Sequence, residues 1–429
     1  MYFVLLPTQL YETTYLSKDY TYILWEHPHY FTKYKFNKKK LLLHKSSMKY
    51  YYEYLQKKKY NVQYIEYTKP FTYRTYTLFD PIDSIKLPGK PEFVESPNFL
   101  LTKEEYGVYR KKTKSFVFNA FYNFGKKCIQ VLEDVKSQDK YNRKTLPKNI
   151  EIPNIPSNTA DRQYIQDSIP FVEKHFPKNY GNTKNFVFPV THKTAKKWLQ
   201  DFIRKRFEKF GDYQDAIIQK ETFLFHSLLS TSLNIGLLQP MDVIQEVMKY
   251  RKTIPINSLE GFVRQLFWRE YQRYCYIYVD FTTSYFRNTK KLSKDWYHGT
   301  TGILPVDTSI QNAFDNGYLH HIERLMVIGN YMNLSGINEK EGFRWFMEFS
   351  CDSYEWVMYQ NVYDMVFFVT GGKTMRKPYV SSSNYIVKMS NYKKDTWCDT
   401  WNTLYYQFLK KHKQKLWKFR YHFRGLQDV

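Results

Sequence analysis

The stretch IPINSLEGFVRQLFWREYQR, residues 254–273, is the most informative part of this chain. Read as a helix, it places Gln265, Trp268 and Arg269 on one face, because residues at i, i+3 and i+4 are neighbours on a helix surface. Arginine can form paired hydrogen bonds with a phosphate, and tryptophan can stack on a base. An amphipathic core helix with solvated charges would show the same pattern, so the surrounding sequence has to decide between the two.

Five other long stretches accompany this one in a fixed order. They are FGDYQDAI at 210–217, HSLLSTSLNIGLLQPMDVI at 226–244, NGYLHHIERLMVIGNYMNLSGI at 316–337, RWFMEFSCDSYEWVMYQNVYDM at 344–365 and GGKTMRKPYVSSSNYIVKMSNY at 371–392. The set resembles the flavin-binding region of the photolyase and cryptochrome family. It is most similar to the branch of prokaryotic (6-4) photolyases, also called iron-sulfur bacterial cryptochromes and photolyases. Several long motifs in one order are a specific signal, unlike a single short pattern.

The first quarter of the chain alternates short apolar runs with lysine-rich helical stretches. This alternation predicts a βαβ pattern and therefore a parallel sheet. The expected strands are at 2–6, 20–26 and 60–67, and the expected crossover helix is at 46–59. No GxGxxG motif is present, so the pattern predicts no dinucleotide site here.

The rest of the chain predicts a connection followed by helices. A polar segment rich in Lys, Asn and Pro holds one expected helix near 115–135, and the remainder shows helical periodicity, with a helix start at Pro240. We therefore expect three parts. They are an α/β antenna-type domain at 1–105, an interdomain linker at 106–169 and a large all-helical FAD-binding catalytic domain at 170–429, where the names of the domains come from the resemblance.

The net charge of the chain is +24, with a sequence pI near 9.5. Such an excess of basic residues predicts a polyanionic partner, with DNA as the leading candidate. A generally basic surface that aids solubility is the alternative. Lysine, tyrosine, phenylalanine and asparagine all have AT-rich codons, so part of the excess can reflect the genome of an AT-rich bacterium or a large DNA virus.

The four cysteines, at 128, 275, 351 and 398, form no CxxC pair, which favours a reducing compartment over a disulfide framework. The first ten residues read as a strand, not as a signal peptide, and no apolar run reaches membrane-spanning length. We expect an intracellular monomer, in the cytoplasm or the nucleoid, without a membrane partner.

The resemblance implies an FAD site. Residues 226–230 offer backbone N–H groups and hydroxyls at a helix start, which suit a pyrophosphate, although helix capping by Ser227 and Ser230 is the plain alternative. An ion pair between Arg324 and Asp352 is expected against the ring. The FAD contacts implied by the resemblance are Phe210, Gly211, Gln214, His226, Ser227, Leu228, Leu229, Ser230, Gln265, Arg269, Arg324, Asp352 and Asn361.

The resemblance also implies catalytic and substrate-binding residues. Repair of a (6-4) photoproduct needs a proton donor, and the pair His320 and His321 matches the paired histidines of the family. We assign His321 as the donor and His320 as its partner. Tyr379 matches a tyrosine at the substrate pocket, with Met365 and Trp268 as further substrate contacts.

An aromatic electron relay is the third implication. Trp345 matches its member nearest the flavin, but Phe346 stands where the family has a tyrosine and is harder to oxidise. The outer tryptophan aligns with Tyr297, and Trp296 lies beside it in the sequence. A route through Trp345, Trp296 and Tyr297 is therefore expected to differ from that of the family.

The sequence departs from the branch at its iron-sulfur cluster. Only Cys398 aligns with one of the four ligand cysteines, while Pro305 and Lys393 stand at two others, so we expect no [4Fe–4S] cluster and no other metal site. The lumazine antenna of the branch is contacted by acidic residues, and Thr8 and Tyr30 occupy those positions here. A lumazine therefore remains an open question, and the lone Asp139 is weak evidence for Mg²⁺.

These features together predict a light-driven DNA photolyase that uses reduced FAD, with the (6-4) lesion as its substrate. A cryptochrome-type photoreceptor without repair activity and a pyrimidine-dimer photolyase are the alternatives, and a flavin-free DNA-binding scaffold is a third.

Iron and acid-labile sulfide should be missing from the protein even after anaerobic purification, because one thiolate cannot hold a four-iron cluster. Elemental analysis together with a sulfide assay checks this. A stoichiometric cluster would mean that Pro305 and Lys393 do not stand at the ligand positions.

Overall fold

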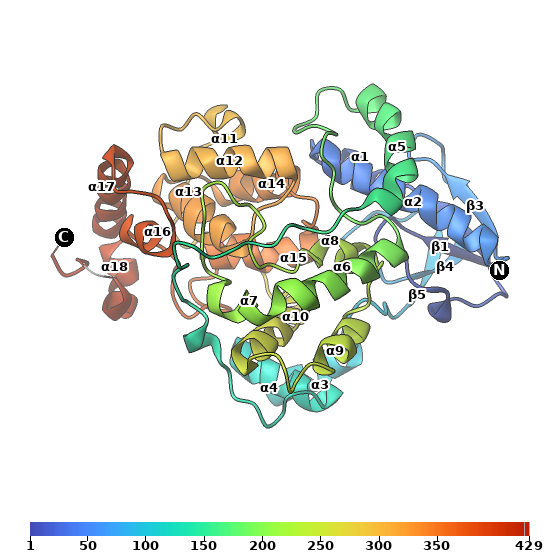
Figure 1. Cartoon of the computed structure of the whole chain (residues 1–429), viewed down its shortest axis with the longest axis horizontal. Helices are drawn as coiled ribbons and strands as arrows, with labels where there is room; N and C mark the ends of the chain where they lie inside the picture. The colour runs from blue at the N-terminus through green and yellow to red at the C-terminus, as the bar shows by residue number, and fades with distance from the viewer. Residues whose placement is uncertain (424, 429) are drawn as a thin grey trace.

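A parallel β-sheet lies at one end of the molecule and helices build the rest (Figure 1). The computed structural model describes residues 1–423 and 425–428. The sheet has the strand order β3-β2-β1-β4-β5, and every neighbouring pair is parallel. The strands are β1 (Tyr2–Leu5), β2 (Thr21–Trp25), β3 (Asn61–Ile65), β4 (Thr75–Phe79) and β5 (Lys90–Val94).

The first three strands occur where the sequence predicted them. In β1 and β2 nearly every residue is buried, as expected for a central parallel strand that is covered on both faces. Strands β4 and β5 were not predicted. In β5 only Pro91 is partly buried and the other residues are exposed, so this edge strand shows no hydrophobic pattern that could reveal it.

Helix α2 (Lys38–Lys57) begins eight residues before the predicted crossover helix. Asn37 caps it by accepting a hydrogen bond from the Lys39 amide, and the Asn37 amide group donates to the Phe314 carbonyl in the helical part (2.9 Å each). Helix α5 (Arg162–His175) packs against α2 on the outside of the sheet region. The cap of α2 therefore also joins the sheet to the helices.

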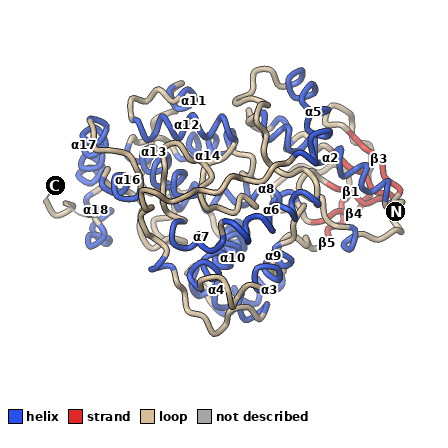
Figure 2. Tube along the Cα trace, viewed as in Figure 1, coloured by secondary structure: helices blue, strands red, loops and turns tan. Residues whose placement is uncertain are grey.

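The strands lie together at one end of the trace, and the rest of the molecule is built from helices and loops (Figure 2). Its α-helices are α3 (Lys103–Lys112), α4 (Phe118–Ile129), α6 (His192–Lys205), α7 (Phe207–Tyr213), α8 (Ser230–Ile235), α9 (Pro240–Met248), α10 (Ile256–Tyr278), α11 (Asp295–His298), α12 (Leu304–Asn316), α13 (Asn330–Leu334), α14 (Glu339–Phe349), α15 (Glu355–Met358), α16 (Asn384–Met389), α17 (Thr396–Lys411) and α18 (Lys413–Leu416). Two segments, η4 (Glu323–Gly329) and η5 (Tyr359–Val366), are π-helical. Short elements elsewhere are α1 (His29–Thr32), η1 (Thr13–Tyr15), η2 (Asp139–Tyr141), η3 (Thr159–Asp161) and η6 (Trp417–His422).

Helix α10, which contains the stretch 254–273, is the central helix of this part. It packs against α4, α7, α9, α15 and η5. Close packing depends on glycine where helices meet: a Cβ at Gly125 of α4 would lie 2.4 Å from the Phe267 ring. Most of α10 is buried, including Glu270 and Arg273. The prediction of a helix here is confirmed, and the helix extends to Tyr278.

The segment 106–169 is not a linker with a single helix. The predicted helix is present as α4, but α3 runs into the segment and α5 begins within it. Between α4 and α5 the chain crosses the face of the helical part before it returns to the sheet region (Figure 1). Hydrogen bonds hold this crossing, including Gln138 N–H to Glu260 and Lys144 N–H to the Asp212 carbonyl.

Within the described residues, no helix is both long and apolar enough to span a membrane.

Gly211 and Gly107 should respond in opposite ways to alanine. A Cβ at Gly211 of α7 would meet the Ser258 nitrogen of α10 at 2.7 Å, so Gly211→Ala should lower the free energy of unfolding by about 1–3 kcal/mol. A Cβ at Gly107 of α3 has nothing within 4 Å, so Gly107→Ala should raise it by about 0.5–1 kcal/mol. Urea unfolding of the two variants checks this, and equal effects would contradict the packing described for α7 and α10.

Candidate functional site

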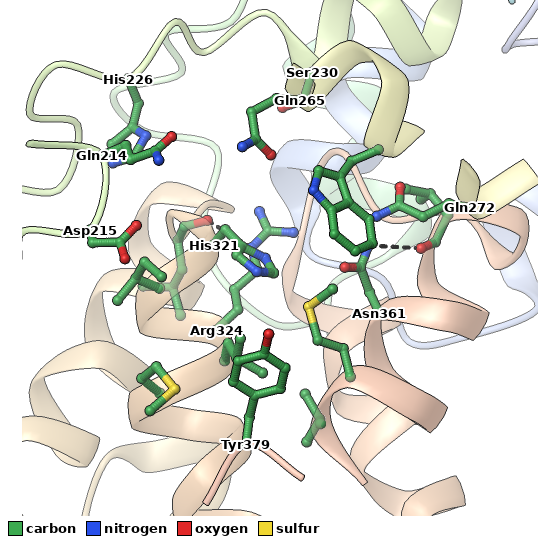
Figure 3. Close-up of a pocket in the computed structure, with 18 of the residues that line it drawn as sticks. Gln214, Asp215, His226, Ser230, Gln265, Gln272, His321, Arg324, Asn361 and Tyr379 are labelled. Atoms are coloured by element: carbon green, nitrogen blue, oxygen red, sulfur yellow. Dashed lines mark hydrogen bonds between the residues drawn. The ribbon is translucent and has the colours of Figure 1, made fainter. Parts of the chain in front are cut away.

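A cavity of about 660 Å³ opens in the helical part. Its walls come from α7 and the loop after it, residues 226–230, α10, the π-helices η4 and η5, and residues 377–381. This size suits a cofactor together with part of a substrate. Figure 3 shows Gln265 entering from α10, His321 and Arg324 at the centre and Tyr379 from the opposite wall.

Most of the site residues predicted from the sequence line this one cavity. They are Phe210, Gln214, His226, Ser227, Leu228, Ser230, Gln265, Trp268, Arg269, His321, Arg324, Asp352, Asn361, Met365 and Tyr379. The shared face of Gln265, Trp268 and Arg269 on α10 is thereby confirmed. Gly211, Leu229, His320, Trp345, Trp296 and Tyr297 do not line it.

Gly211 and Leu229 support the cavity from behind. The Gly211 amide donates to the Ser258 hydroxyl (2.8 Å), which fixes α7 against α10. Leu229 is 1% exposed and belongs to the core. Both were predicted as cofactor contacts, and the structure gives them packing roles next to residues that do face the cavity.

The predicted ion pair between Arg324 and Asp352 is present. Arg324 Nη2 lies 2.9 Å from Asp352 Oδ1, and the Arg324 Nε donates to the Leu319 carbonyl (2.7 Å). Burial raises the pKa of Asp352, but Arg324 and the hydroxyls of Ser230 and Ser350 outweigh it, and the pKa ends below its usual value. The guanidinium is therefore held in one orientation beside the cavity by a permanently ionised carboxylate.

Arg269 has two fixed hydrogen bonds and one free nitrogen, the Nη2 amino group. Its Nε donates to Asn234 Oδ1 (3.1 Å) and its Nη1 to the Asn98 carbonyl (2.5 Å). The Nη2 atom is buried and has no hydrogen-bond partner. Burial lowers the pKa of Arg269 to about 10, so the group stays charged at neutral pH. A buried, charged donor without a partner is costly unless a ligand accepts its hydrogen bond.

Residues 226–230 form a strained turn before α8. Leu228 has φ +57°, a left-handed conformation that costs a residue with a side chain about 1–2 kcal/mol. The next residue, Leu229, is in the αR region. Such a pair turns successive N–H groups to one side and forms an anion-binding nest. The Ser230 hydroxyl donates to Asp352 Oδ2 (2.6 Å), so only the Ser227 hydroxyl remains to donate into the cavity.

The two neighbouring histidines point in different directions. His321 faces the cavity with its side chain exposed to that space, and the low-dielectric surroundings of the cavity together with the charge of Arg324 lower its pKa to about 4. His320 is 2% exposed and stacks on His226, with ring centroids 4.7 Å apart. Its Nε2 lies 3.2 Å from Glu323 Oε2, and burial raises the pKa of Glu323 to about 8.

Trp268 has one face already covered. Its ring stacks on Phe118 of α4 at 3.8 Å with an interplanar angle of 10°. Tyr379 is half-buried and Met365 is buried, and both line the cavity. Stacking of Trp268 on a base is thereby limited to its other face, a restriction the sequence did not indicate.

A cluster of charged residues lies at the cavity, and of its members the sequence singled out only Asp139, as weak evidence for a metal. Asp139 pairs with Arg143 (2.9 Å) and with Arg264. Arg143 Nε also lies 3.7 Å from Asp215, and burial raises the pKa of Asp215 to about 6. Asp139 and Arg143 come from the segment expected to be a linker, and no short motif marks them. The charges of Asp139, Arg143 and Arg264 meet only because the segment between α4 and α5 crosses the helical part next to α10.

Comparisons with known proteins find relatives of this chain. A family model described as deoxyribodipyrimidine photo-lyase-related protein matches residues 3–85 and 76–188. The (6-4) photolyase of Agrobacterium fabrum is 34% identical over 348 residues, which cover 74% of this chain and 67% of that protein. This chain belongs to the photolyase and cryptochrome family.

Two solved structures share the fold of this photolyase-family chain. A bacterial class III photolyase from Agrobacterium tumefaciens has a TM-score of 0.58 and 14% identity over 90% of this chain and 86% of its own. A cryptochrome from Synechocystis has a TM-score of 0.60 and 13% identity over 97% of this chain and 86% of its own. An N-terminal α/β domain followed by a helical domain is thus confirmed for this member of the family.

Members of this family generally bind FAD, and the cavity of this photolyase homologue fits a flavin nucleotide. Buried polar atoms without partners line it at Arg269 Nη2, His226 Nε2 and Asn361 Oδ1. The nest at Leu228 and the free Nη2 of Arg269 suit phosphates, while Arg324 and Asn361 offer hydrogen bonds to a ring edge. A polar, anionic cofactor in the cavity would supply the hydrogen-bond partners that these atoms lack.

The two positions that differ from the iron-sulfur branch have different surroundings: Pro305 is buried and Lys393 is exposed. Pro305 is buried at the start of α12, and Trp397 of α17 donates to the Lys393 carbonyl (3.2 Å). Cys398 is 7% exposed. Among the described residues, no group of three or more His, Cys, Asp or Glu side chains is placed to hold a metal ion. The absence of a cluster stays a prediction for elemental analysis.

The two positions of the antenna site are also packed. Tyr30 is 2% exposed, and its hydroxyl accepts from the Thr8 hydroxyl (3.4 Å). The Tyr30 ring lies against His44 and Tyr354, both of which are buried. Whether a second chromophore binds this chain stays open.

Ser227→Ala should weaken FAD binding by on the order of 1–3 kcal/mol, because it removes one hydroxyl donor to a phosphate. Arg269→Ala should lower FAD retention more, since it also leaves Glu270 buried without its neighbouring charge. FAD released on denaturation, measured per folded protein, checks both. Arg251→Ala is the matched control, because Arg251 pairs with Asp134 on the surface and should retain FAD normally.

Proposed function

We propose that this chain is a DNA photolyase that reverses the (6-4) photoproduct of ultraviolet-damaged DNA with light and reduced FAD. The observation that carries the proposal is the position of His321. This histidine faces the same cavity as Arg269 and Asn361, the expected cofactor contacts, and as Tyr379 and Met365, the predicted substrate contacts. A site that combines a cofactor cradle with a proton donor is what repair of this lesion needs.

FAD, when bound, supplies the excited electron that drives repair. The chain supports the cofactor with the N–H nest of residues 226–230 and the free N–H group of Arg269 at its phosphates. Arg324, held by Asp352, offers a fixed positive charge near the ring. Leu228, Phe210 and Met365 line the cavity with apolar surface and would limit the access of water to a bound cofactor.

His321 must gain a proton before it can donate one. Its pKa of about 4 means that the ring is neutral at pH 7 in the chain without cofactor and DNA. A bound phosphodiester and a negatively charged cofactor both favour the imidazolium form and so raise the pKa. We therefore infer that substrate binding itself charges His321. Repair should decline as pH rises through the pKa that His321 has in the complex.

His320 supports His321 without touching the cavity. Its ring is fixed between His226 and Glu323 (4.7 Å between the ring centroids and 3.2 Å between His320 Nε2 and Glu323 Oε2). The pKa of His320 lies well below its usual value because of burial and the neighbouring His226, so the ring stays neutral. We assign it a positioning role for the backbone that presents His321.

The DNA partner is supported by charge. The chain carries a net charge of +24, and Arg143, Arg264 and Lys377 line the cavity beside Asp139 and Asp215. A flipped nucleotide would bring its phosphates toward these cations. Release of counterions from these phosphates gives an affinity that falls with salt.

His321→Ala should reduce (6-4) repair by about 10²–10⁴-fold, because a positioned acid contributes that much to a rate. FAD retention and affinity for damaged DNA should stay near those of the parent chain, because other residues hold cofactor and duplex. The measurement is repair of a duplex with one defined (6-4) lesion under blue light, with dark samples as the baseline. His320→Ala should be milder, which separates a positioning residue from a donor.

The same assay with a cyclobutane dimer separates the alternatives. A parent chain that repairs only dimers is a pyrimidine-dimer photolyase and overturns the lesion assignment. A chain that repairs neither lesion while its FAD still responds to light is a photoreceptor. Full (6-4) repair by His321→Ala would show that another group supplies the proton.

A further inference from the structure

The short helix η6 presents two aromatic rings to solvent. Trp417 is 46% exposed and Tyr421 is 83% exposed. Tryptophan is among the most buried residue types on average, and exposed aromatic rings gathered on one element mark a contact surface. None of the roles described above uses these two rings. Helix α18, which leads into η6, lies at the end of the molecule opposite the sheet (Figure 1).

Buried residues on the other side of η6 fix its backbone. The Phe419 ring packs on Phe368, with 5.4 Å between the ring centroids, and Phe423 is 4% exposed. Lys418 Nζ donates a hydrogen bond to the Gly371 carbonyl (3.0 Å). The two exposed rings are therefore presented on a backbone that is already held in place, which lowers the entropy cost of binding a ligand.

The guanidinium of Arg420 lies beside both rings. Its Cζ atom is 5.5 Å from the centre of the Trp417 ring and 4.5 Å from the centre of the Tyr421 ring, within the range of a cation–π attraction. Its Nη1 donates to the Trp417 carbonyl (3.3 Å) and its Nη2 to the Tyr421 hydroxyl (3.0 Å). One cation that contacts both rings places them side by side, so a single ligand can reach all three side chains.

The charges in this part of the chain are positive. Residues 400–427 contain no aspartate or glutamate, whereas lysine and arginine are frequent there. Burial and the charges of Arg287 and Lys411 lower the pKa of Lys415. Burial and the charges of Lys411 and Lys415 lower the pKa of His412 to about 4. The cations are thus close enough to repel one another, and a bound polyanion would relieve that repulsion.

The end of η6 reaches the cavity described above. His422, which is exposed, and Phe423, which is buried, both line that cavity. Lys377 lines it as well, and the hydrogen bond from Lys418 to Gly371 joins η6 to the chain that leads to Lys377. A nucleic acid on η6 would therefore lie next to the cations of the cavity, which favours this class of polyanion over others.

Exposed rings distinguish a single strand from a duplex as the ligand. In a duplex each base face is covered by the neighbouring base pairs, whereas the bases of a single strand are free to stack on aromatic side chains. Cations beside the rings attract the phosphates of the same strand. Stacking of this kind tolerates any sequence, because every base has an aromatic face.

We propose that the η6 surface, formed by Trp417, Lys418, Arg420, Tyr421 and His422, binds single-stranded DNA. Unpaired bases stack on Trp417 and Tyr421, and the cations of the surface contact the phosphates. The binding needs neither light nor a lesion, because base faces and phosphates are present in every strand. It goes beyond the proposed function, which concerns a damaged nucleotide inside the cavity.

Fluorescence anisotropy of a short labelled oligothymidylate, titrated in the dark with the full chain, tests this surface. Trp417→Ala and Tyr421→Ala should each weaken binding about 5- to 150-fold, as the loss of one base–aromatic stack does. Trp417→Phe should keep most of the affinity, because a phenyl ring still stacks on a base. Phe93→Ala is the matched control and should bind like the parent chain, since Phe93 is 56% exposed on β5 in the sheet. Far-ultraviolet circular dichroism shows whether each variant has folded.

Affinity like that of the parent chain in both Trp417→Ala and Tyr421→Ala would overturn the proposal. An equal loss of affinity for the fully paired duplex would also overturn it, because charge and not stacking would then hold the ligand. Binding to vesicles that contain phosphatidylglycerol, without binding to oligothymidylate, would assign the surface to a membrane instead. Repair of the (6-4) lesion is measured separately. A chain that binds the single strand but repairs no lesion would refute the proposed function and leave this inference standing.

Discussion

The carboxylate of Asp352 holds the site together. One oxygen accepts from Arg324 (2.9 Å) and from the Ser350 hydroxyl (2.5 Å), and the other accepts from the Ser230 hydroxyl (2.6 Å). The Asp352 backbone carbonyl accepts a hydrogen bond from Asn234 Nδ2 of α8. The Oδ1 atom of the same Asn234 accepts from Arg269 of α10. A buried charge is stable only when it is paired and hydrogen-bonded, and here the required partners come from η4, α8 and the chain before α15. The position of the cavity walls relative to one another therefore follows from satisfying a single anion.

Sequence reasoning found the elements with strong local signals. The buried strands β1 and β2, helix α10 and the Pro240 helix start all have local patterns that the structure bears out. The cavity residues that lie within long sequence motifs were also predicted, because those motifs are themselves local patterns. Edge strand β5 was missed because its exposed residues carry no period, and the roles of Asp139 and Arg143 were missed because they depend on where a polar segment crosses the helices.

Orientation was the part of the site that sequence could not supply. His320 and His321 are adjacent in the chain, yet one is in the core and one faces the cavity. The difference arises because His320 lies in the irregular chain before the helix and His321 is its first residue, so their side chains leave the backbone in different directions. The same limit holds for Ser230, whose hydroxyl is committed to Asp352, while the similar Ser227 keeps its own hydroxyl for the cavity.

The crossing segment between α4 and α5 has a consequence for how the chain folds. Helix α5 packs on α2, whereas Gln138 and Lys144, in the segment between α4 and α5, are held by Glu260 and Asp212, which leave the ribosome later. The path of this segment is therefore settled only after α7 and α10 are made and have docked. Contacts between such distant parts of a chain slow folding, because the entropy cost of closing the loop comes before the contacts can stabilise it. The two halves of this molecule are thus expected to fold as one cooperative unit, although their architectures differ.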